Sequence, residues 1–160
     1  MTAGGSSIPE VQSLLSVLAA GRRVAEAGTA FGEGAEAMAR TAMSVVTVEL
    51  DPDRAALAAQ RLAPYENVEL LVGDWRELLP ARGPFGLLFL DGGGFKRDPE
   101  AGSDLVFGLL ERGGLLVLDD LTPGREEFDP VRGWAHSHPG LKAAEVLTTT
   151  ATSALLVTRI

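Results

Sequence analysis

The sequence of 160 residues contains no cysteine. That absence excludes disulfide scaffolds, thiolate metal sites and thiol nucleophiles together. Long hydrophobic runs are missing as well, since the longest, at 86–90, is far shorter than the ~18 apolar residues of a membrane span. Residues 1–7 are small and polar and do not resemble a secretory signal peptide. These absences predict a cytoplasmic protein with no membrane partner.

Basic charge is also in short supply: Lys and Arg number 14 against 22 Asp and Glu, which gives a formal net charge of −8. A negatively charged surface repels a polyanion, so we expect no nucleic-acid partner. The length predicts a single domain over residues 1–160, large enough to fold without a disulfide or metal. Glycine is abundant, with 19 residues, and its placement decides whether these mark simple turns or a site.

Short runs of β-forming residues alternate with helical segments along the chain. Predicted strands cover residues 24–27, 45–50, 68–72, 85–90, 115–118, 142–148 and 153–160. Predicted helices cover residues 7–21, 34–42, 51–63, 75–79, 99–110 and 129–137. Only residues 149–152 separate the last two strands, too few for a parallel crossover, so these strands are expected to be antiparallel. Repeated β-α units closed by a hairpin predict a doubly wound α/β fold, in which ligands bind beyond the carboxyl ends of the strands.

The end of the first predicted strand is followed by a glycine-rich turn, Glu26 to Gly34. Glycines there allow the backbone to approach a ligand closely, although a tight turn into a helix would need them too. The second predicted strand ends at Glu49, 21 positions after Gly28. An acid at that place can accept both hydroxyls of a ribose, and the alternative is a solvated carboxylate.

The third predicted strand is followed by Gly73, Asp74 and Trp75. Asp74 could accept an adenine amino proton while Trp75 packs on the ring. Equally, Asp74 could cap the short helix that begins at Trp75, and the two roles do not exclude each other.

The fourth and fifth predicted strands end in acids: Asp91 precedes the run Gly92–Gly94, and Asp119–Asp120 closes the fifth strand. Neighbouring strands would bring these three carboxylates together, and Mg²⁺ or Ca²⁺ would relieve their repulsion. The alternative is that one Asp points to solvent while another caps a turn. Lys96 could act as a base or orient an acceptor oxygen, or it could simply be solvated.

In chain order, the strand ends carry Glu26-x-Gly28-Thr29-x-x-Gly32, Val48-Glu49-x-Asp51, Gly73-Asp74, Phe89-Leu90-Asp91, and Gly113-Gly114-Leu115 through Asp119-Asp120. Over about residues 6–160, this series resembles class I S-adenosylmethionine-dependent methyltransferases, more narrowly the catechol and caffeoyl-CoA type O-methyltransferases. The resemblance implies a Rossmann-like, seven-stranded mixed sheet with its last strand antiparallel and helices on both faces. It also implies methyl transfer from S-adenosylmethionine to a hydroxyl of a small-molecule acceptor.

The resemblance assigns roles to residues of this sequence. Gly28, Thr29 and Gly32 would face the methionine part of the cofactor, Glu49 the ribose, and Asp74 with Trp75 the adenine. The full predicted cofactor-binding set is Glu26, Gly28, Thr29, Ala30, Gly32, Glu49, Leu50, Gly73, Asp74, Trp75 and Asp91. The predicted metal ligands are Asp91, Asp119 and Asp120, and the predicted catalytic residues are Lys96 and Asp91.

Several positions depart from the family pattern. Ala30 replaces a usual glycine, Gly34 stands where members often have a hydroxyl residue, and Asp120 stands where they usually have Asn. The family's lysine position is Gly94 here, and Lys96 is the nearest lysine. Little chain precedes the cofactor motifs, so either the acceptor site is open or a partner subunit, as in a homodimer, completes it. Two alternatives stay open: a cofactor-binding module without catalysis, and an NAD-dependent oxidoreductase, whose G-x-G-x-x-G pattern fails at Ala30 and Glu33.

Overall fold

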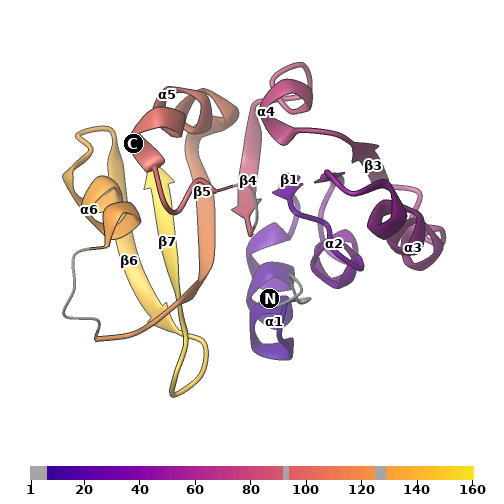
Figure 1. Ribbon diagram of the computed structural model, residues 1–160, viewed down its shortest axis with the longest axis horizontal. Helices are drawn as coiled ribbons and strands as arrows, with labels where there is room; N and C mark the ends of the chain where they lie inside the picture. Colours follow the sequence, from indigo (N-terminus) through magenta and orange to yellow (C-terminus); the bar gives the residue numbers. More distant parts are fainter. Residues whose placement is uncertain (1–6, 92–93, 125–128) are drawn as a thin grey trace.

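A twisted sheet forms the centre of the computed structural model, which describes residues 7–91, 94–124 and 129–160. The sheet has seven strands in the order β3-β2-β1-β4-β5-β7-β6, running from right to left in Figure 1. The strands are β1 (Arg23–Ala27), β2 (Ser44–Glu49), β3 (Val68–Val72), β4 (Phe85–Leu90), β5 (Leu110–Leu121), β6 (Leu141–Leu147) and β7 (Ser153–Arg159). This arrangement confirms the predicted seven-stranded, Rossmann-like sheet.

The helices alternate with the strands as the sequence predicts. They are α1 (Pro9–Ala19), α2 (Glu33–Ala39), α3 (Pro52–Leu62), α4 (Trp75–Leu78), α5 (Pro99–Leu109) and α6 (Pro130–Ser137). Four of them, α1, α3, α5 and α6, have proline in the first turn, where its missing N–H is harmless. No helix within the described ranges is long and apolar enough to cross a membrane.

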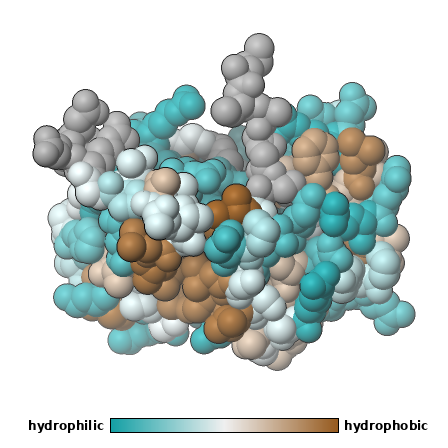
Figure 2. All heavy atoms as spheres, turned by 90° about the horizontal axis from the view of Figure 1, so that it is seen from below, coloured by the Kyte–Doolittle hydropathy of each residue, from teal (hydrophilic) through white to brown (hydrophobic). Residues whose placement is uncertain are grey.

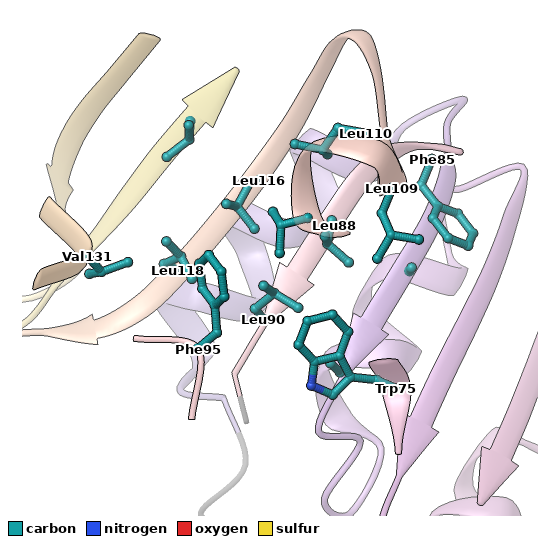
Figure 3. Packing of buried hydrophobic residues seen from close by; sticks show 14 of the residues in the cluster. Trp75, Phe85, Leu88, Leu90, Phe95, Leu109, Leu110, Leu116, Leu118 and Val131 are labelled. Atoms are coloured by element: carbon teal, nitrogen blue, oxygen red, sulfur yellow. The ribbon is translucent and has the colours of Figure 1, made fainter. Parts of the chain in front are cut away.

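Strand β4 lies at the centre of the sheet and every one of its residues is buried. It pairs in parallel with β1 on one side and β5 on the other. Its side chains alternate between two hydrophobic cores, because successive residues of a strand point to opposite faces. Leu88 and Leu90 join the core that holds Trp75 and Phe95, shown in Figure 3. Leu87 and Phe89 join the core on the other face, with residues of α1, α2 and α3.

Strand β7 is inserted between β5 and β6 and is antiparallel to both, as the short connection predicts. The ladder between β5 and β7 shifts register between Leu118 and Leu121. Asp120, inside that irregular stretch, has a left-handed backbone with φ of 57°. The end of β5 is therefore a bulge rather than a regular strand.

Strand β5 is also longer than the predicted 115–118, because it begins at Leu110. Its glycine pair, Gly113–Gly114, resembles a turn before a strand in the sequence. A Cβ on Gly114 would lie 2.8 Å from the carbonyl oxygen of Glu111 and 3.0 Å from that of Phe85. The glycine is needed because backbone segments approach closely there.

Candidate functional site

The turn between β1 and α2 brings backbone N–H groups to the carboxyl end of the sheet. Gly28 and Gly32 have φ values of 97° and 88°, which favour glycine. Ala30 also has a positive φ, 49°, although it carries a Cβ. The alanine at this family glycine position therefore keeps a conformation that glycine adopts more readily.

Glu49 ends β2 directly beside this turn and is buried, with 7% of its surface exposed. Its Oε2 accepts a hydrogen bond of 2.8 Å from the N–H of Ala30, and its Oε1 accepts one of 3.0 Å from the N–H of Asp51. The predicted alternative of a freely solvated carboxylate is wrong. Both oxygens are held in place at the edge of the glycine-rich turn.

Glu26 lies deeper in β1 and is 1% exposed. The hydroxyl of Thr47 donates to its Oε2 at 2.6 Å, and the hydroxyls of Thr47 and Thr29 are 2.6 Å apart. Burial, followed by the negative charge of nearby carboxylates, raises the pKa of Glu26 to about 8. A Cβ on Gly34 would overlap its Oε1, which explains why this chain has glycine there.

The segment after β3 holds the residues predicted to contact adenine. Asp74 caps α4 by accepting a hydrogen bond of 2.9 Å from the N–H of Arg76, as one sequence alternative predicts. Trp75 is 5% exposed and packs in the hydrophobic core, and its buried Nε1 has no hydrogen-bond partner among the described residues. Leu50 is 73% exposed, and Gly73 donates its N–H to the carbonyl of Glu49. The adenine contacts stay a prediction.

Three carboxylates meet where β4 and β5 end. One oxygen from each of Asp91, Asp119 and Asp120 lies within 4.8 Å of the others. Asp119 is 3% exposed, and its Oδ1 is buried without a hydrogen-bond partner in the described part of the chain. Burial and the neighbouring carboxylates raise the pKa of Asp119 to about 8, and burial with the charge of Asp120 raises that of Asp91. The three carboxylates therefore lie together, as the sequence predicts.

The bulge in β5 explains how two consecutive residues join one cluster. Side chains of successive residues in a regular strand point to opposite faces. The left-handed backbone of Asp120 breaks this alternation, so that its carboxylate comes near that of Asp119. Sequence order indicates the cluster, but it carries no signal for the bulge.

Lys96 lies at the same cluster. Its Nζ donates a hydrogen bond of 2.9 Å to the carbonyl oxygen of Asp119, and its charge partly offsets the rise in the pKa of Asp91 and Asp119 that burial causes. The preceding residue, Phe95, is 2% exposed and packs edge-on against Trp134 at 5.2 Å, which anchors the segment. Gly92 and Gly93 of the predicted glycine run lie outside the described residues.

Two further residues near the site were not found by the sequence reasoning. Thr47, fully buried in β2, links Glu26 to Thr29, and a polar residue between valines was the available signal. Arg132 of α6 binds the segment after β5, and nothing in its sequence surroundings indicates this.

Figure 2 shows the molecule from below, the side toward which β4 points in Figure 1. Hydrophobic residues gather near the middle of this face, with hydrophilic residues around them.

The sheet order, the antiparallel β7, and the acid and glycine positions at the strand ends define a class I S-adenosylmethionine-dependent methyltransferase. The family model of the methyltransferase domain matches residues 25–121, more than half of the chain. The chain therefore belongs to this methyltransferase family, and its architecture resembles that of the O-methyltransferases. The NAD-dependent alternative has no support from these findings.

Solved structures agree with this assignment. Cofactor-bound Rv0187 from MTB is 28% identical, with a TM-score of 0.77 over 96% of this chain and 82% of that one. An O-methyltransferase from Bacillus cereus in complex with SAH shares the fold, with a TM-score of 0.78 at 19% identity, covering 99% of this chain and 84% of that one. Both structures share the architecture of this chain, and the second holds SAH.

A third relative corrects one expectation. The small-subunit ribosomal RNA methyltransferase A of Leuconostoc citreum is 41% identical over 51 residues, which is 32% of this chain and 17% of that protein. Structures of rRNA and tRNA methylases also share the fold. The exclusion of nucleic acid as a partner was therefore wrong. A net charge of −8 sums over the whole surface, whereas contact with phosphates depends on the charges that face them.

Proposed function

We propose that this protein transfers the methyl group of S-adenosylmethionine to an oxygen of its acceptor, with a divalent cation held by Asp91, Asp119 and Asp120. The observation that carries the proposal is the set of three carboxylate oxygens within 4.8 Å of one another at the carboxyl ends of β4 and β5. Such a cluster beside a cofactor turn is the arrangement that metal-assisted O-methylation needs.

The residues of the cluster fit a hard cation such as Mg²⁺ or Ca²⁺. All three donors are carboxylates, the ligand type that these ions prefer. The buried Oδ1 of Asp119 has no partner among the described residues, so it is available for an ion. A divalent cation bound there would polarise an acceptor hydroxyl and lower its pKa.

The cofactor side of the proposal rests on the turn after β1 and on Glu49. Glu49 is proposed to bind the ribose, because its carboxylate is already oriented by the N–H groups of Ala30 and Asp51. The backbone of Gly28, Thr29 and Gly32 is proposed to bind the methionine part. Fixing both substrates in line supplies much of the rate enhancement in a displacement of this kind.

Lys96 is proposed to act at the acceptor oxygen. Its Nζ lies beside the acidic cluster through the bond to the carbonyl of Asp119. A positive charge there would stabilise the oxyanion that forms as the acceptor hydroxyl loses its proton. Asp91, after β4, is proposed to serve both the cluster and the adjacent cofactor.

Methyl transfer to a catechol, with Mg²⁺ or with a chelator, tests the proposal. We expect transfer with Mg²⁺ and its loss with the chelator, whereas calorimetric binding of S-adenosylmethionine persists in both. Catechol methylation that is indifferent to the chelator would remove the cation from the mechanism. Cofactor binding without transfer to any acceptor would instead favour a binding module.

A nucleic-acid acceptor is the second candidate, because of the 41% identity to the ribosomal RNA methyltransferase over 51 residues. Small-subunit ribosomal RNA and a catechol can be offered in parallel with labelled methyl donor. Labelling of the RNA alone would favour the second candidate and overturn the first.

A further inference from the structure

The bulge that carries Asp119 and Asp120 lacks the support that a regular strand has. The ladder to β7 is interrupted between Leu118 and Leu121, and Asp120 occupies a left-handed conformation that costs a non-glycine residue about 1 kcal/mol. Such a conformation persists only when surrounding contacts impose it. Contacts to the backbone that follows Asp120 are therefore expected to hold the bulge in place.

Two side chains bind the backbone just after the bulge. The hydroxyl of Ser153 in β7 lies 3.3 Å from the carbonyl oxygen of Leu121 and shares its single proton between that oxygen and Glu145. The Nη2 of Arg132 in α6 donates to the carbonyl of Thr122 at 2.8 Å. Both bonds act on consecutive carbonyls, one and two residues after Asp120.

Arg132 is itself held by two carboxylates. Its Nε and Nη2 bind Glu145 of β6 at 2.9 and 2.6 Å, and its Nη1 binds Asp129 at 2.7 Å. Glu145 also accepts a hydrogen bond from the hydroxyl of Ser153. Only 17% of the Arg132 side chain is exposed, although its bonds to Glu145 and Thr122 lie at the surface. The planar guanidinium reaches all three partners at once, which a lysine ammonium on a flexible stem does not.

We propose that Arg132 is a positioning residue for the acidic cluster: by holding the backbone at Thr122, it fixes the bulge that presents Asp119 and Asp120. Arg132 touches neither the carboxylates of the cluster nor the cofactor turn in any described contact. Its effect is transmitted through the backbone between Asp119 and Thr122. The inference deepens the proposed function and rests on it for the cation.

The test compares Arg132→Met and Arg132→Lys with the wild type. Arg82→Met is the matched control, since Arg82 binds Glu69 through bonds of 2.9–3.0 Å at the opposite end of the sheet. We expect Arg132→Met to weaken Mn²⁺ binding about tenfold, as supporting residues around metal ligands do. The affinity for S-adenosylmethionine should stay within about twofold, since a pure positioning effect on β5 spares the cofactor turn. Arg132→Lys should lie between Met and wild type, and Arg82→Met should change neither affinity.

Amide hydrogen exchange over residues 115–124 provides a readout that needs no metal. Faster exchange at 119–122 in Arg132→Met, with β1 and β2 unchanged, supports the positioning role. Unchanged exchange together with unchanged Mn²⁺ affinity overturns it, and so does an equal loss of cofactor affinity, which would mean general loosening. If the wild type binds no Mn²⁺, the cation proposal fails, and the exchange measurement alone decides the role of Arg132.

Discussion

The two halves of the site differ in how completely the protein itself satisfies them. On the proposed cofactor side, both oxygens of Glu49 accept backbone hydrogen bonds. On the proposed acceptor side, Asp119 has a buried oxygen without a described partner, and two other carboxylates lie within 4.8 Å. Both oxygens of Glu49 have hydrogen-bond partners, whereas Asp119 keeps one unpartnered oxygen among carboxylates whose charge Lys96 offsets only in part.

Glu49 is therefore preorganised for a ligand, whereas the carboxylates around Asp119 repel one another when they are charged. Hydrogen bonds to Glu49 cost nothing further when a ligand arrives, because the carboxylate is already oriented. The cluster around Asp119 is unfavourable while its carboxylates are charged, and it becomes favourable when a cation enters. Substitutions on each side of the site test this difference.

Asp119→Asn removes one of the three clustered carboxylates and should therefore disrupt the proposed cation site. We expect metal-dependent methyl transfer to fall about 100-fold or more, because a ligand and its charge are removed. Without metal and above about pH 8, where Asp119 is charged, the variant should melt at a higher temperature than the wild type, since one repelling carboxylate is gone. Rate assays and thermal melts check both, with Asp104→Asn, at an exposed position of α5, as the control. A wild-type rate in Asp119→Asn would contradict the metal site.

Glu49→Ala should damage only the cofactor side. Hydrogen bonds to a charged group are worth about 1.5–3 kcal/mol, so the affinity for S-adenosylmethionine should fall about 10- to 100-fold. Calorimetry measures this, and Mn²⁺ titration of the same variant should match the wild type. Unchanged cofactor affinity would show that the acid at the end of β2 is misassigned.

Glu26, between the two halves, predicts a pH dependence of stability. Its pKa of about 8 in the folded protein lies above the ordinary 4.5, so between these values the folded state holds a proton that the unfolded chain has released. The free energy of unfolding should therefore decrease as the pH rises from 4.5 to about 8, on the order of a few kcal/mol.

Glu26→Gln should reduce this slope, because glutamine stays neutral at every pH. Urea unfolding at pH 5 and at pH 8 measures the free energy of unfolding at both ends of this range and so gives the sign of the slope. The exposed Glu10→Gln on α1 should retain the wild-type slope. An undiminished slope in Glu26→Gln would assign the pH dependence to other groups, the acidic cluster first.

The smallest effect concerns the turn itself. Ala30→Gly should change the free energy of unfolding by less than about 0.5 kcal/mol, because relief of the left-handed strain offsets the added chain entropy. Ala37→Gly is the matched control: both alanines are 7% exposed, but Ala37 lies within α2. There glycine should cost about 1 kcal/mol. Denaturant melts distinguish the two, and equal losses would contradict the strain at Ala30.

Much of the fold was predictable because its signals are local. The unbroken apolar run of β4 indicated the buried centre, and the short connection between β6 and β7 indicated the antiparallel hairpin. Strand β5 was predicted too short because Gly113–Gly114 resembles a turn, and the close backbone contacts that require Gly114 are not local.

The sequence predicted those site residues that directly follow the ends of strands. Asp91, Asp119 and Asp120 follow adjacent strands, so their convergence was visible in the sequence. The bulge at Asp120 and the contacts of Arg132 depend on residues from other elements, Ser153 and Glu145 among them. The net charge led to the wrong exclusion of nucleic acid, because it contains no information on where each charge lies.

The placement of β7 also bears on the order in which the chain is assembled during synthesis. In the described sheet, β6 borders β7 alone, and β7 separates it from β5. When β6 leaves the ribosome, it has no strand to join until Ser153–Arg159 has followed. Pairings between distant segments are slow to form, and domains grow from the N-terminus during translation. The turn between β1 and α2 can thus assemble early, while the bulge with its acidic cluster waits for β7.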